Sequence, residues 1–338
     1  MDKISAGVIG LGTWGQTHLE AYSQHGGVEL AAVCDRDEER LREAAERYGV
    51  DVCFTDYTRM LDETDLDAVS VVTPDFTHTD IVVHAVRAGK AVLVEKPLAV
   101  TLDDCDRIAE ALADSPVPFM VDFHNRWSPG VAYMRERIEA GALGQVQMIY
   151  YRLSDTIFVP TQMLSWAGRS SVNWFLGSHC LDTMRWLLRD EVVRVYTVSR
   201  SHVLRGMGIN TADFYLSTVE FAGGAQALLE NCWIMPESSP SLVDFKLEVV
   251  GEREAFHFDG SPHRLVHLTD DGPKCPDTFI SPRVHGRSVG FAVESIRYFA
   301  DCVLAGETPT AGFDDGRKVT EIILGMERSV RTGEPVDL

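Results

Sequence analysis

The chain reads ISAGVIGLGTWG from Ile4 to Gly15, an apolar run that ends in glycines spaced as Gly-x-Gly-x-x-Gly. A strand that ends in such a turn and leads directly into a helix is typical of the start of a parallel sheet covered by helices. Short apolar runs and longer amphipathic stretches continue to alternate up to about residue 122. We therefore predict a doubly wound α/β domain over residues 1–122.

Apolar runs predict the strands of this domain at 4–9, 29–34, 52–54, 68–72, 91–94 and 118–121. Helices are predicted between them, near 14–25, 37–48, 78–88 and 102–113. The run at 68–72 is almost continuously apolar, as expected of a strand whose sheet has helices on both faces.

The pattern changes after residue 122. Helices are predicted over 131–140 and about 175–189, with a long irregular segment between them. Long strand-like runs follow with no helix between them, at 192–200, 212–221, 225–233, 243–250 and 253–258, and two helices near 288–304 and 315–331 end the chain. Consecutive strands without crossovers predict a large, mostly antiparallel open sheet, so residues 123–338 should form an α+β domain.

The chain is strongly acidic. Its 338 residues include 31 basic and 51 acidic side chains, which gives a formal net charge of −20 at pH 7 and a pI near 4.9. Such a charge repels the phosphates of nucleic acids and of anionic lipids, so neither is an expected partner. With 45% hydrophobic residues, each of two domains can bury its own core.

The cysteine pattern indicates a reducing compartment. Seven cysteines are scattered along the chain without a Cys-x-x-Cys pair, which favours free thiols over a disulfide framework. Apolar runs fall short of the roughly 18 residues of a membrane-spanning helix, and the first strand begins too early for a signal peptide. We predict a cytoplasmic protein without a membrane anchor.

The glycine turn predicts a dinucleotide site. Gly10 permits a tight turn, Gly12 lets the backbone approach a pyrophosphate, and Gly15 lets helix and strand pack closely. Thr13 and Trp14 lie in the same turn. The alternative interpretation is a glycine-rich turn without a ligand.

An acidic residue supports the dinucleotide interpretation. Asp35 ends the second predicted strand, 20 residues after Gly15, where a carboxylate can accept both ribose hydroxyls. It would repel a 2′-phosphate, so NAD is favoured over NADP, although the neighbouring Arg36 leaves NADP open. A merely surface-exposed aspartate is the alternative.

Further polar residues follow the fourth and fifth predicted strands. Thr73, Pro74 and His78 should lie at the carboxyl edge of the sheet, where ligands bind, although His78 could equally be an ordinary helix-start residue. Glu95-Lys96-Pro97 ends the fifth strand, in a chain with only six lysines. Lys96 suits a group that hydrogen-bonds a reacting hydroxyl and polarises the incipient carbonyl. Its alternative role is a salt bridge to Glu95 or another carboxylate.

These motifs together resemble the glucose-fructose oxidoreductase and inositol dehydrogenase family (Gfo/Idh/MocA). The resemblance rests on Gly10-Leu11-Gly12-Thr13-Trp14-Gly15, Asp35, Thr73-Pro74, His78, Glu95-Lys96-Pro97, His124-Asn125-Arg126 and the run from Gly177 to Asp182. It implies an N-terminal Rossmann domain, NAD(P)-dependent oxidation or reduction of a sugar, cyclitol or similar polyol, and a cis peptide before Pro97. It also implies homodimers or homotetramers that pack through the open face of the second domain's sheet.

The family's usual Asp-x-x-x-His-x-x-Asp pattern is incomplete here. His179 and Asp182 match its last two positions, but Phe175 stands where the first aspartate is expected. The resemblance implies that His179 is the general base in oxidation, with Asp182 holding its tautomer. An imidazole suits this role because its unperturbed pKa is about 6.5. The alternative is that His179 only packs within its helix.

Residues of the second domain supply candidates for substrate binding. Arginine and asparagine side chains can donate to substrate oxygens, and tryptophan offers a flat face to the C–H side of a sugar ring. These candidates, each of which could instead serve the core or an interface, are Asn125, Arg126, Trp127, Arg152, Asp155, Trp166 and Trp174.

We therefore expect an NAD(P)-dependent dehydrogenase acting on CH–OH groups, with Lys96, His179 and Asp182 as catalytic residues. Two alternatives stay open: a hydrolase or lyase that retains NAD and oxidises its sugar transiently, and a non-catalytic dinucleotide-binding protein. No metal is expected, because histidines and cysteines form no closely spaced ligand set. The motifs of serine hydrolases and phosphate-loop enzymes are missing from the sequence.

Overall fold

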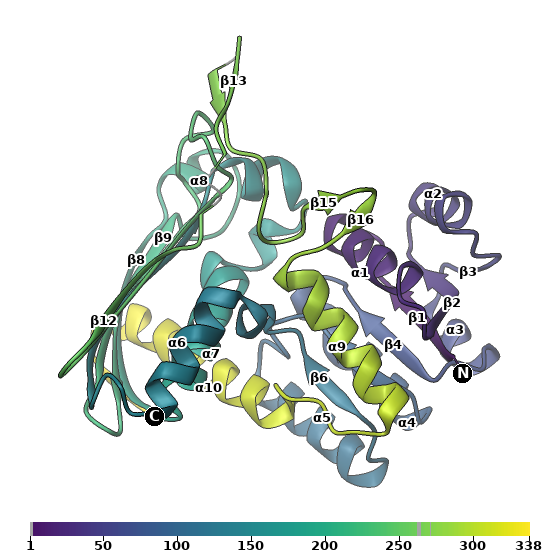
Figure 1. Cartoon of the computed structure of the whole chain (residues 1–338), viewed down its shortest axis with the longest axis horizontal. Coiled ribbons are helices and arrows are strands. Elements are labelled where there is room, and N and C mark those ends of the chain that lie inside the picture. Colours follow the sequence, from purple (N-terminus) through teal and green to yellow (C-terminus); the bar gives the residue numbers. More distant parts are fainter. Residues whose placement is uncertain (1–2, 262–264, 271) are drawn as a thin grey trace. The chain divides into compact units, whose positions relative to one another are not determined.

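A computed structural model describes residues 3–261, 265–270 and 272–338 and shows two compact units (Figure 1). The first unit comprises Met1–His124 and Ile280–Lys318, and the second comprises Asn125–Phe279 and Val319–Leu338. The division predicted from the sequence, at 122–123, placed all later residues in the second domain. In the structure, the segment 280–318 packs with the first unit instead.

The first unit contains a parallel sheet with the strand order β3-β2-β1-β4-β5-β6. Its strands are β1 Ile4–Ile9, β2 Val28–Cys34, β3 Val52–Phe54, β4 Ala68–Val71, β5 Ala91–Val94 and β6 Phe119–Val121. Its helices are α1 Thr13–Ser23, α2 Glu38–Tyr48, α3 Tyr57–Glu63, α4 His78–Arg87, α5 Leu102–Asp114 and α9 Phe291–Ala305. This order is that of a doubly wound Rossmann fold, so the predicted fold class is confirmed.

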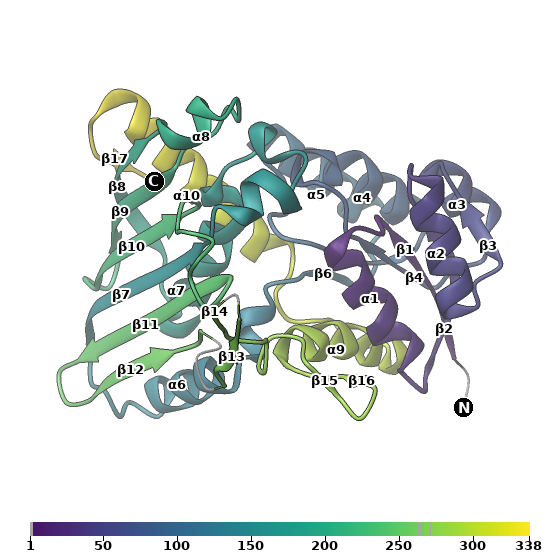
Figure 2. The same ribbon diagram turned by 90° about the horizontal axis from the view of Figure 1, so that it is seen from above.

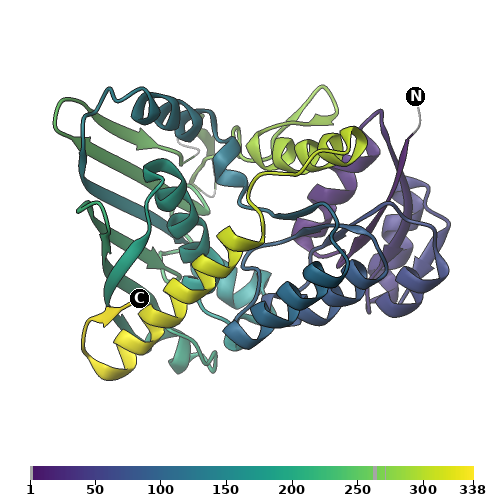
Figure 3. The same cartoon turned by 90° about the horizontal axis from the view of Figure 1, so that it is seen from below.

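Helix α9 covers the face of the sheet on which α1 lies, and the two helices run side by side (Figures 1 and 3). Phe291, Ile296 and Phe299 of α9 are buried. After α9, the amide of Val121 donates to the carbonyl of Ala311, which fixes the returning chain to strand β6. The sequence predicted this helix but could not show that its apolar face packs against a sheet formed almost 200 residues earlier.

The second unit contains a mixed sheet with the strand order β12-β11-β7-β10-β9-β8-β17 (Figure 2). Its strands are β7 Val146–Asp155, β8 Val192–Arg200, β9 Phe214–Phe221, β10 Gln226–Cys232, β11 Val243–Gly251, β12 Ala255–Asp259 and β17 Val336–Asp337. Its other elements include α6 Pro129–Glu139, α7 Ser178–Leu188, the short α8 Val203–Gly206, and the hairpin of β13 His267–Thr269 with β14 Gly272–Lys274. Helix α10 Phe313–Thr332 belongs to both units, and β15 Arg283–Val284 pairs with β16 Arg287–Ser288 in the first.

Several elements were not predicted: the short helix α8, the short strands β13 to β17, helix α3 and strand β7. Helix α3 is only seven residues long, although Asp56 caps it by accepting from the amide of Thr58. Strand β7 lies in the segment that the sequence left irregular. It pairs in parallel with β10 and antiparallel with β11, so the sheet is mixed at its centre. The period-two alternation is blurred in β7 because its last three residues, Leu153 to Asp155, are all buried.

The two faces of the second sheet differ. Helices α6 and α7 lie on one face, where Tyr151 and Leu247 are buried (Figure 1). The opposite face exposes large apolar side chains at alternate strand positions. We call this the open sheet face, defined by Met148, Tyr196, Val198, Leu216 and Leu228, which are 39–49% exposed. No helix in the described part of the chain is long and apolar enough to span a bilayer.

Candidate active site

The turn after β1 is shaped by two close backbone approaches. Gly10 has a φ of +97°, and a Cβ atom on it would lie 2.5 Å from the carbonyl oxygen of Val72. A Cβ atom on Gly15 would overlap the carbonyl oxygen of Gly10. Gly12 differs, because a Cβ atom there would meet only the Arg40 guanidinium, at 3.9 Å. Packing thus explains Gly10 and Gly15, whereas Gly12 is the position that the dinucleotide motif reserves for approach of the pyrophosphate.

The start of helix α1 suits an anion. Gly12 is its N-cap residue and offers no side-chain hydrogen bond, and the first turn carries no acidic residue. Helices α2 and α5 instead begin with side-chain caps, from Asp37 and Thr101. The first backbone amides of a helix need acceptors, so the uncapped amides of α1 can bind phosphate oxygens.

Asp35 is fixed beside this turn. Its Oδ2 accepts from the amide of Leu11 at 2.7 Å, and its Oδ1 accepts from the amide of Asp37 at 2.9 Å. The Arg40 guanidinium lies 3.8 Å from Oδ2 and is half exposed. Arg36 is exposed. The carboxylate is thus held where the motif places the adenosine ribose.

The other predicted residues of the turn lie in different surroundings. Thr13 is exposed, and the half-buried ring of Trp14 packs against His124, with ring centroids 5.3 Å apart. Burial, reinforced by the charge of Lys96, holds the pKa of His124 well below its ordinary value. An uncharged, flat surface therefore adjoins the glycine turn.

His78 ties two loops together. Its Nδ1 lies 2.8 Å from the carbonyl oxygen of Pro97, and its Nε2 lies 2.8 Å from that of Thr73. Burial lowers the pKa of His78, while the two carbonyls oppose this change. A neutral imidazole can donate to only one of these two carbonyls, so His78 holds the loops after β4 and β5 through one donated hydrogen bond and one close contact. Pro74 follows Thr73 in the sequence and is the N-cap residue of the short helix η1 Asp75–Thr77.

Lys96 follows β5 in the first unit. The Lys96–Pro97 peptide bond is cis, as the family resemblance implied. The neighbouring Glu95 is buried, and its Oε1 lies 3.0 Å from Nε2 of His18. Burial raises the pKa of Glu95, while the positive charge of Lys96 acts in the opposite direction. His18 and Asp122 were not among the predicted site residues. The strand order could have indicated Asp122, because Glu95 and Asp122 follow the adjacent parallel strands β5 and β6.

In the second unit, Arg126 and Asp182 form a buried bidentate ion pair. Arg126 Nε donates to Asp182 Oδ2 at 2.9 Å, and Nη2 donates to Oδ1 at 2.5 Å. The Asn125 side chain donates to the Tyr151 hydroxyl at 3.2 Å. Trp127 is half buried. Arg126 thus fixes the carboxylate that the sequence assigned to orienting His179.

His179 is the second residue of α7 and is 5% exposed. A π-helical turn, η5 Asn173–Gly177, leads into this helix and carries Phe175. The ring of Phe175 lies edge-on to Trp166 at 6.3 Å and tilted against Trp233 at 5.7 Å. An aromatic cluster therefore occupies the place at which the family pattern has a carboxylate.

The remaining candidates are held inside the second unit. Trp174 is buried, and its Nε1 donates to Glu327 at 2.7 Å. Arg152 pairs with Glu230 at 3.1 Å and with Asp244 at 2.8 Å. Arg152 has the opposite parity on β7 to Tyr151, which faces α7, so it lies on the far face of the sheet from His179. Asp155 is buried at the end of β7.

Known proteins resemble both parts of the chain. A model described as "Oxidoreductase family, NAD-binding Rossmann fold" matches residues 4–123, and one described as "GFO/IDH/MocA C-terminal domain" matches residues 131–257. The scyllo-inositol 2-dehydrogenase (NAD(+)) of Bacillus subtilis is 28% identical over 99% of this chain and 96% of its own length. Inositol 2-dehydrogenase 1 of Saccharopolyspora erythraea is 30% identical over 74% of this chain and 72% of its own. The crystal structure of myo-inositol 2-dehydrogenase from Lactobacillus plantarum superposes with a TM-score of 0.87, at 23% identity and full coverage of both chains.

The glycine turn allows a matched pair of substitutions. Gly15→Ala should lower the free energy of unfolding by about 3 kcal/mol, because the methyl group overlaps backbone and α1 must move. Gly12→Ala should cost at most about 1 kcal/mol, because its methyl group meets only a flexible guanidinium. Urea unfolding measures both. A Gly15→Ala variant as stable as the parent protein would contradict the packing argument.

The Asp35 carboxylate should control cofactor preference. Asp35→Ala should weaken NAD binding by about 2 kcal/mol and narrow the preference over NADP, because a hydrogen bond to ribose and a repulsive charge are both lost. Asp37→Ala is the control. It should cost about 1 kcal/mol of stability by removing the cap of α2, with the NAD to NADP ratio unchanged. Fluorescence titration with both cofactors measures the ratio, and an unaltered ratio in Asp35→Ala would show that Asp35 does not touch ribose.

Proposed function

Because the chain belongs to the Gfo/Idh/MocA oxidoreductase family and its first unit is an NAD-binding domain, we propose that it oxidises a secondary hydroxyl group of a cyclitol, sugar or related polyol. The observation that carries this proposal is the Asp35 carboxylate, held at the glycine turn by the amide of Leu11. Its two oxygens can accept ribose hydroxyls and would repel a 2′-phosphate. NAD is therefore the proposed cofactor, with NADP as a poorer alternative.

The residues of the first unit fit this cofactor. The uncapped start of α1 and the lack of a packing role for Gly12 suit a pyrophosphate, and Asp35 suits the ribose. When bound, NAD accepts the hydride at its nicotinamide ring. This chain's own residues bind the substrate, polarise its hydroxyl group and remove the proton.

We assign these tasks to three residues. Lys96 donates a hydrogen bond to the reacting oxygen and stabilises the negative charge that develops there. His179 accepts the hydroxyl proton as general base. Asp182, through its ion pair with Arg126, fixes the start of α7 and thereby the position of His179. Phe175 cannot take a proton, so no second acid–base group stands one helical turn before His179.

The relatives favour a polyol substrate. The aligned proteins are named for oxidation of inositols, which carry a ring of secondary hydroxyl groups. The half-buried rings of Phe175 and Trp166 offer apolar surface that suits the C–H face of such a ring, and the fully buried Trp233 packs against Phe175. We propose a cyclitol or a pyranose sugar ahead of an open-chain alcohol.

A substrate panel tests the proposal. Purified protein is mixed with NAD and with cyclitols, aldoses, sugar acids or anhydrosugars in turn, and NADH is followed by absorbance. Stoichiometric NADH formation with a polyol supports a dehydrogenase. Product formation without added NAD would indicate the NAD-retaining hydrolase or lyase, and NAD binding without turnover on any compound would indicate a dinucleotide-binding protein.

The open sheet face supports self-association. Leu216 of β9 lies opposite Val198 of β8, and Leu228 of β10 lies opposite Thr218 of β9, so the exposed apolar residues lie on adjacent strands. A patch of this kind is typical of a protein interface. We propose a homodimer or homotetramer formed through it. We also propose a reducing compartment such as the cytoplasm, supported by seven free cysteines.

The His179 role predicts a selective loss of turnover. His179→Ala should reduce NADH formation by about 100-fold or more while NAD affinity is retained, because only the proton acceptor is removed. His257→Ala is the control, since this side chain of the same unit is 71% exposed and pairs only loosely with Glu248, at 3.5 Å. Steady-state kinetics and NAD titration separate the two effects. Near-normal turnover of His179→Ala would leave the residue a structural role only.

The oligomer depends on the open sheet face. Leu228→Asp should shift the protein to a smaller species in size-exclusion chromatography with light scattering, because a buried charge without a partner opposes association. Leu268→Asp should leave the mass unchanged, since Leu268 is 78% exposed in the β13–β14 hairpin, away from this face. A monomeric parent protein would refute the proposed interface.

A further inference from the structure

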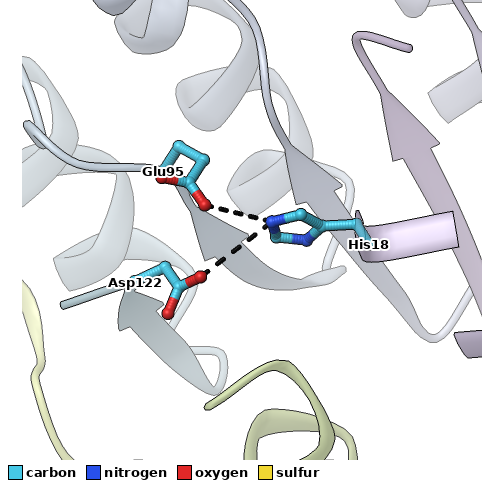
Figure 4. A group of neighbouring side chains, drawn as sticks. All are labelled: His18, Glu95 and Asp122. Carbon is cyan, nitrogen blue, oxygen red and sulfur yellow. Dashed lines mark hydrogen bonds and ion pairs between the residues drawn. The ribbon is translucent and has the colours of Figure 1, made fainter. Parts of the chain in front are cut away.

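A fully enclosed polar cluster lies inside the first unit (Figure 4). His18 comes from α1, Glu95 follows β5 and Asp122 follows β6. One ligand atom from each lies within 4.8 Å of the others, and the three residues are 0%, 6% and 0% exposed. Because two carboxyl groups and an imidazole are buried together here, their charge must be balanced within the cluster.

Hydrogen bonds that all run in one direction satisfy both ring nitrogens of His18. The Tyr22 hydroxyl lies 2.7 Å from Ser70 Oγ, Ser70 Oγ lies 3.0 Å from His18 Nδ1, and His18 Nε2 lies 3.0 Å from Glu95 Oε1. Burial lowers the pKa of His18 to about 4, so its ring is neutral and carries one hydrogen. Placing that hydrogen on Nε2 lets Tyr22 donate to Ser70, Ser70 donate to His18, and His18 donate to the Glu95 carboxylate. Every side chain in this series then has a hydrogen-bond partner.

Unlike Glu95, Asp122 accepts no hydrogen bond from His18. Within the described ranges, neither of its carboxyl oxygens has a hydrogen-bond partner, and His18 Nε2 and His124 Nδ1 are 3.9 Å from Oδ2. An ionised carboxylate buried without donors, beside a second carboxylate, is strongly unfavourable. A protonated carboxyl group removes both problems, because it is uncharged and is itself a donor.

We propose that Asp122 is a carboxylic acid at neutral pH and shares its proton with Glu95, so that the buried pair carries a single negative charge. Burial raises the pKa of Asp122 well above its ordinary value and the charge of Glu95 raises it further, which outweighs the opposing effects of His18 and of the Ser295 hydroxyl group. The groups that face the pair are His18 and Tyr22 of α1, Lys96 after β5, His124 of η2 His124–Trp127 and Ser295 of α9.

The shared proton makes Asp122 a positioning residue. Its carboxyl group lies beside that of Glu95, and both face Nε2 of His18 (Figure 4), while Glu95 is the neighbour of Lys96 in sequence. A single negative charge on the pair then balances the ammonium group of Lys96. Two negative charges would repel the negative charge that develops on the reacting oxygen. This consequence rests on the proposed role of Lys96, but the protonation state does not.

Infrared spectroscopy tests the protonation state directly. At neutral pH, the difference spectrum of the parent protein minus Asp122→Asn should show a protonated carboxyl C=O band that shifts in D₂O, because exposed carboxyl groups are ionised. In the parent protein alone, this band should disappear as the pH is raised. If the difference spectrum shows carboxylate bands instead, the proposal is overturned, whatever the turnover of the enzyme.

Asp213 supplies a matched control. It is also buried, at 1% exposure, but accepts from the backbone amides of His202, Val203 and Leu204. Burial opposes its ionisation, but these three donors outweigh burial and lower its pKa. The spectrum of the parent protein minus Asp213→Asn should therefore show loss of a carboxylate and no carboxylic acid band.

The pH dependence of stability gives a second measurement. A carboxyl group whose folded-state pKa is raised keeps its proton after the unfolded chain has lost its own, so the native state loses stability as pH rises from about 4 towards the folded-state pKa. The melting temperature of Asp122→Asn, relative to the parent protein, should therefore rise steadily between about pH 5 and pH 8. That of Asp213→Asn should be lower than the parent value by a constant amount over this range, since a lowered pKa affects stability only in acid.

A bound cation is the competing explanation. Three such ligands could hold a divalent metal in place of the shared proton. Stoichiometric zinc or manganese in the purified protein, lost in Asp122→Asn, would overturn the proposal, as would a melting-temperature difference for Asp122→Asn that does not change with pH. Metal-free protein with the carboxylic acid band supports it.

Discussion

Helix α1 approaches the end of β1 at a distance that only glycine permits, and the candidate cofactor site depends on that approach. The carbonyl oxygen of Gly10 lies where a Cβ atom of Gly15 would be, and Gly10 itself adopts a positive φ beside Val72. The uncapped amides of α1 and the Leu11 amide that binds Asp35 lie in this one turn. The motif is therefore a packing requirement at two glycines, whereas the third, Gly12, has open space around it, where we propose that the pyrophosphate binds.

The same sheet edge positions Lys96 through two buried histidines. His18 binds the carboxyl group of Glu95, on one side of the lysine, and His78 binds the carbonyl of Pro97, on the other. Burial lowers the pKa of both imidazoles. With a pKa of about 4, the His18 ring adds no like charge beside the ammonium group of Lys96. In the proposed mechanism, the positive charge at the reacting oxygen comes from Lys96.

The sequence predicted the parts of the fold that local patterns determine. Strands β1 to β6 alternate with helices, and the glycine turn and Asp35 mark the order of the first elements. It did not predict β7, whose parallel partner β10 follows about 80 residues later, or the return of α9 to the first unit. Such pairings leave no periodic signal in either segment. For the site, spacing indicated Asp35 and Lys96, but contacts across the sheet, such as His18 with Glu95, could be found only from the fold.

In the second unit, the residues that match the family pattern do not by themselves determine the charge around His179. Asp182 has the position and residue type that the family pattern assigns to orienting His179, yet both of its oxygens accept from the guanidinium of Arg126. Its negative charge is therefore largely compensated inside the unit, and Phe175 adds none where the pattern has a further carboxylate. The helix that carries His179 is thus preceded by an aromatic cluster and carries an ion-paired aspartate, at the two positions where the family pattern has carboxylates.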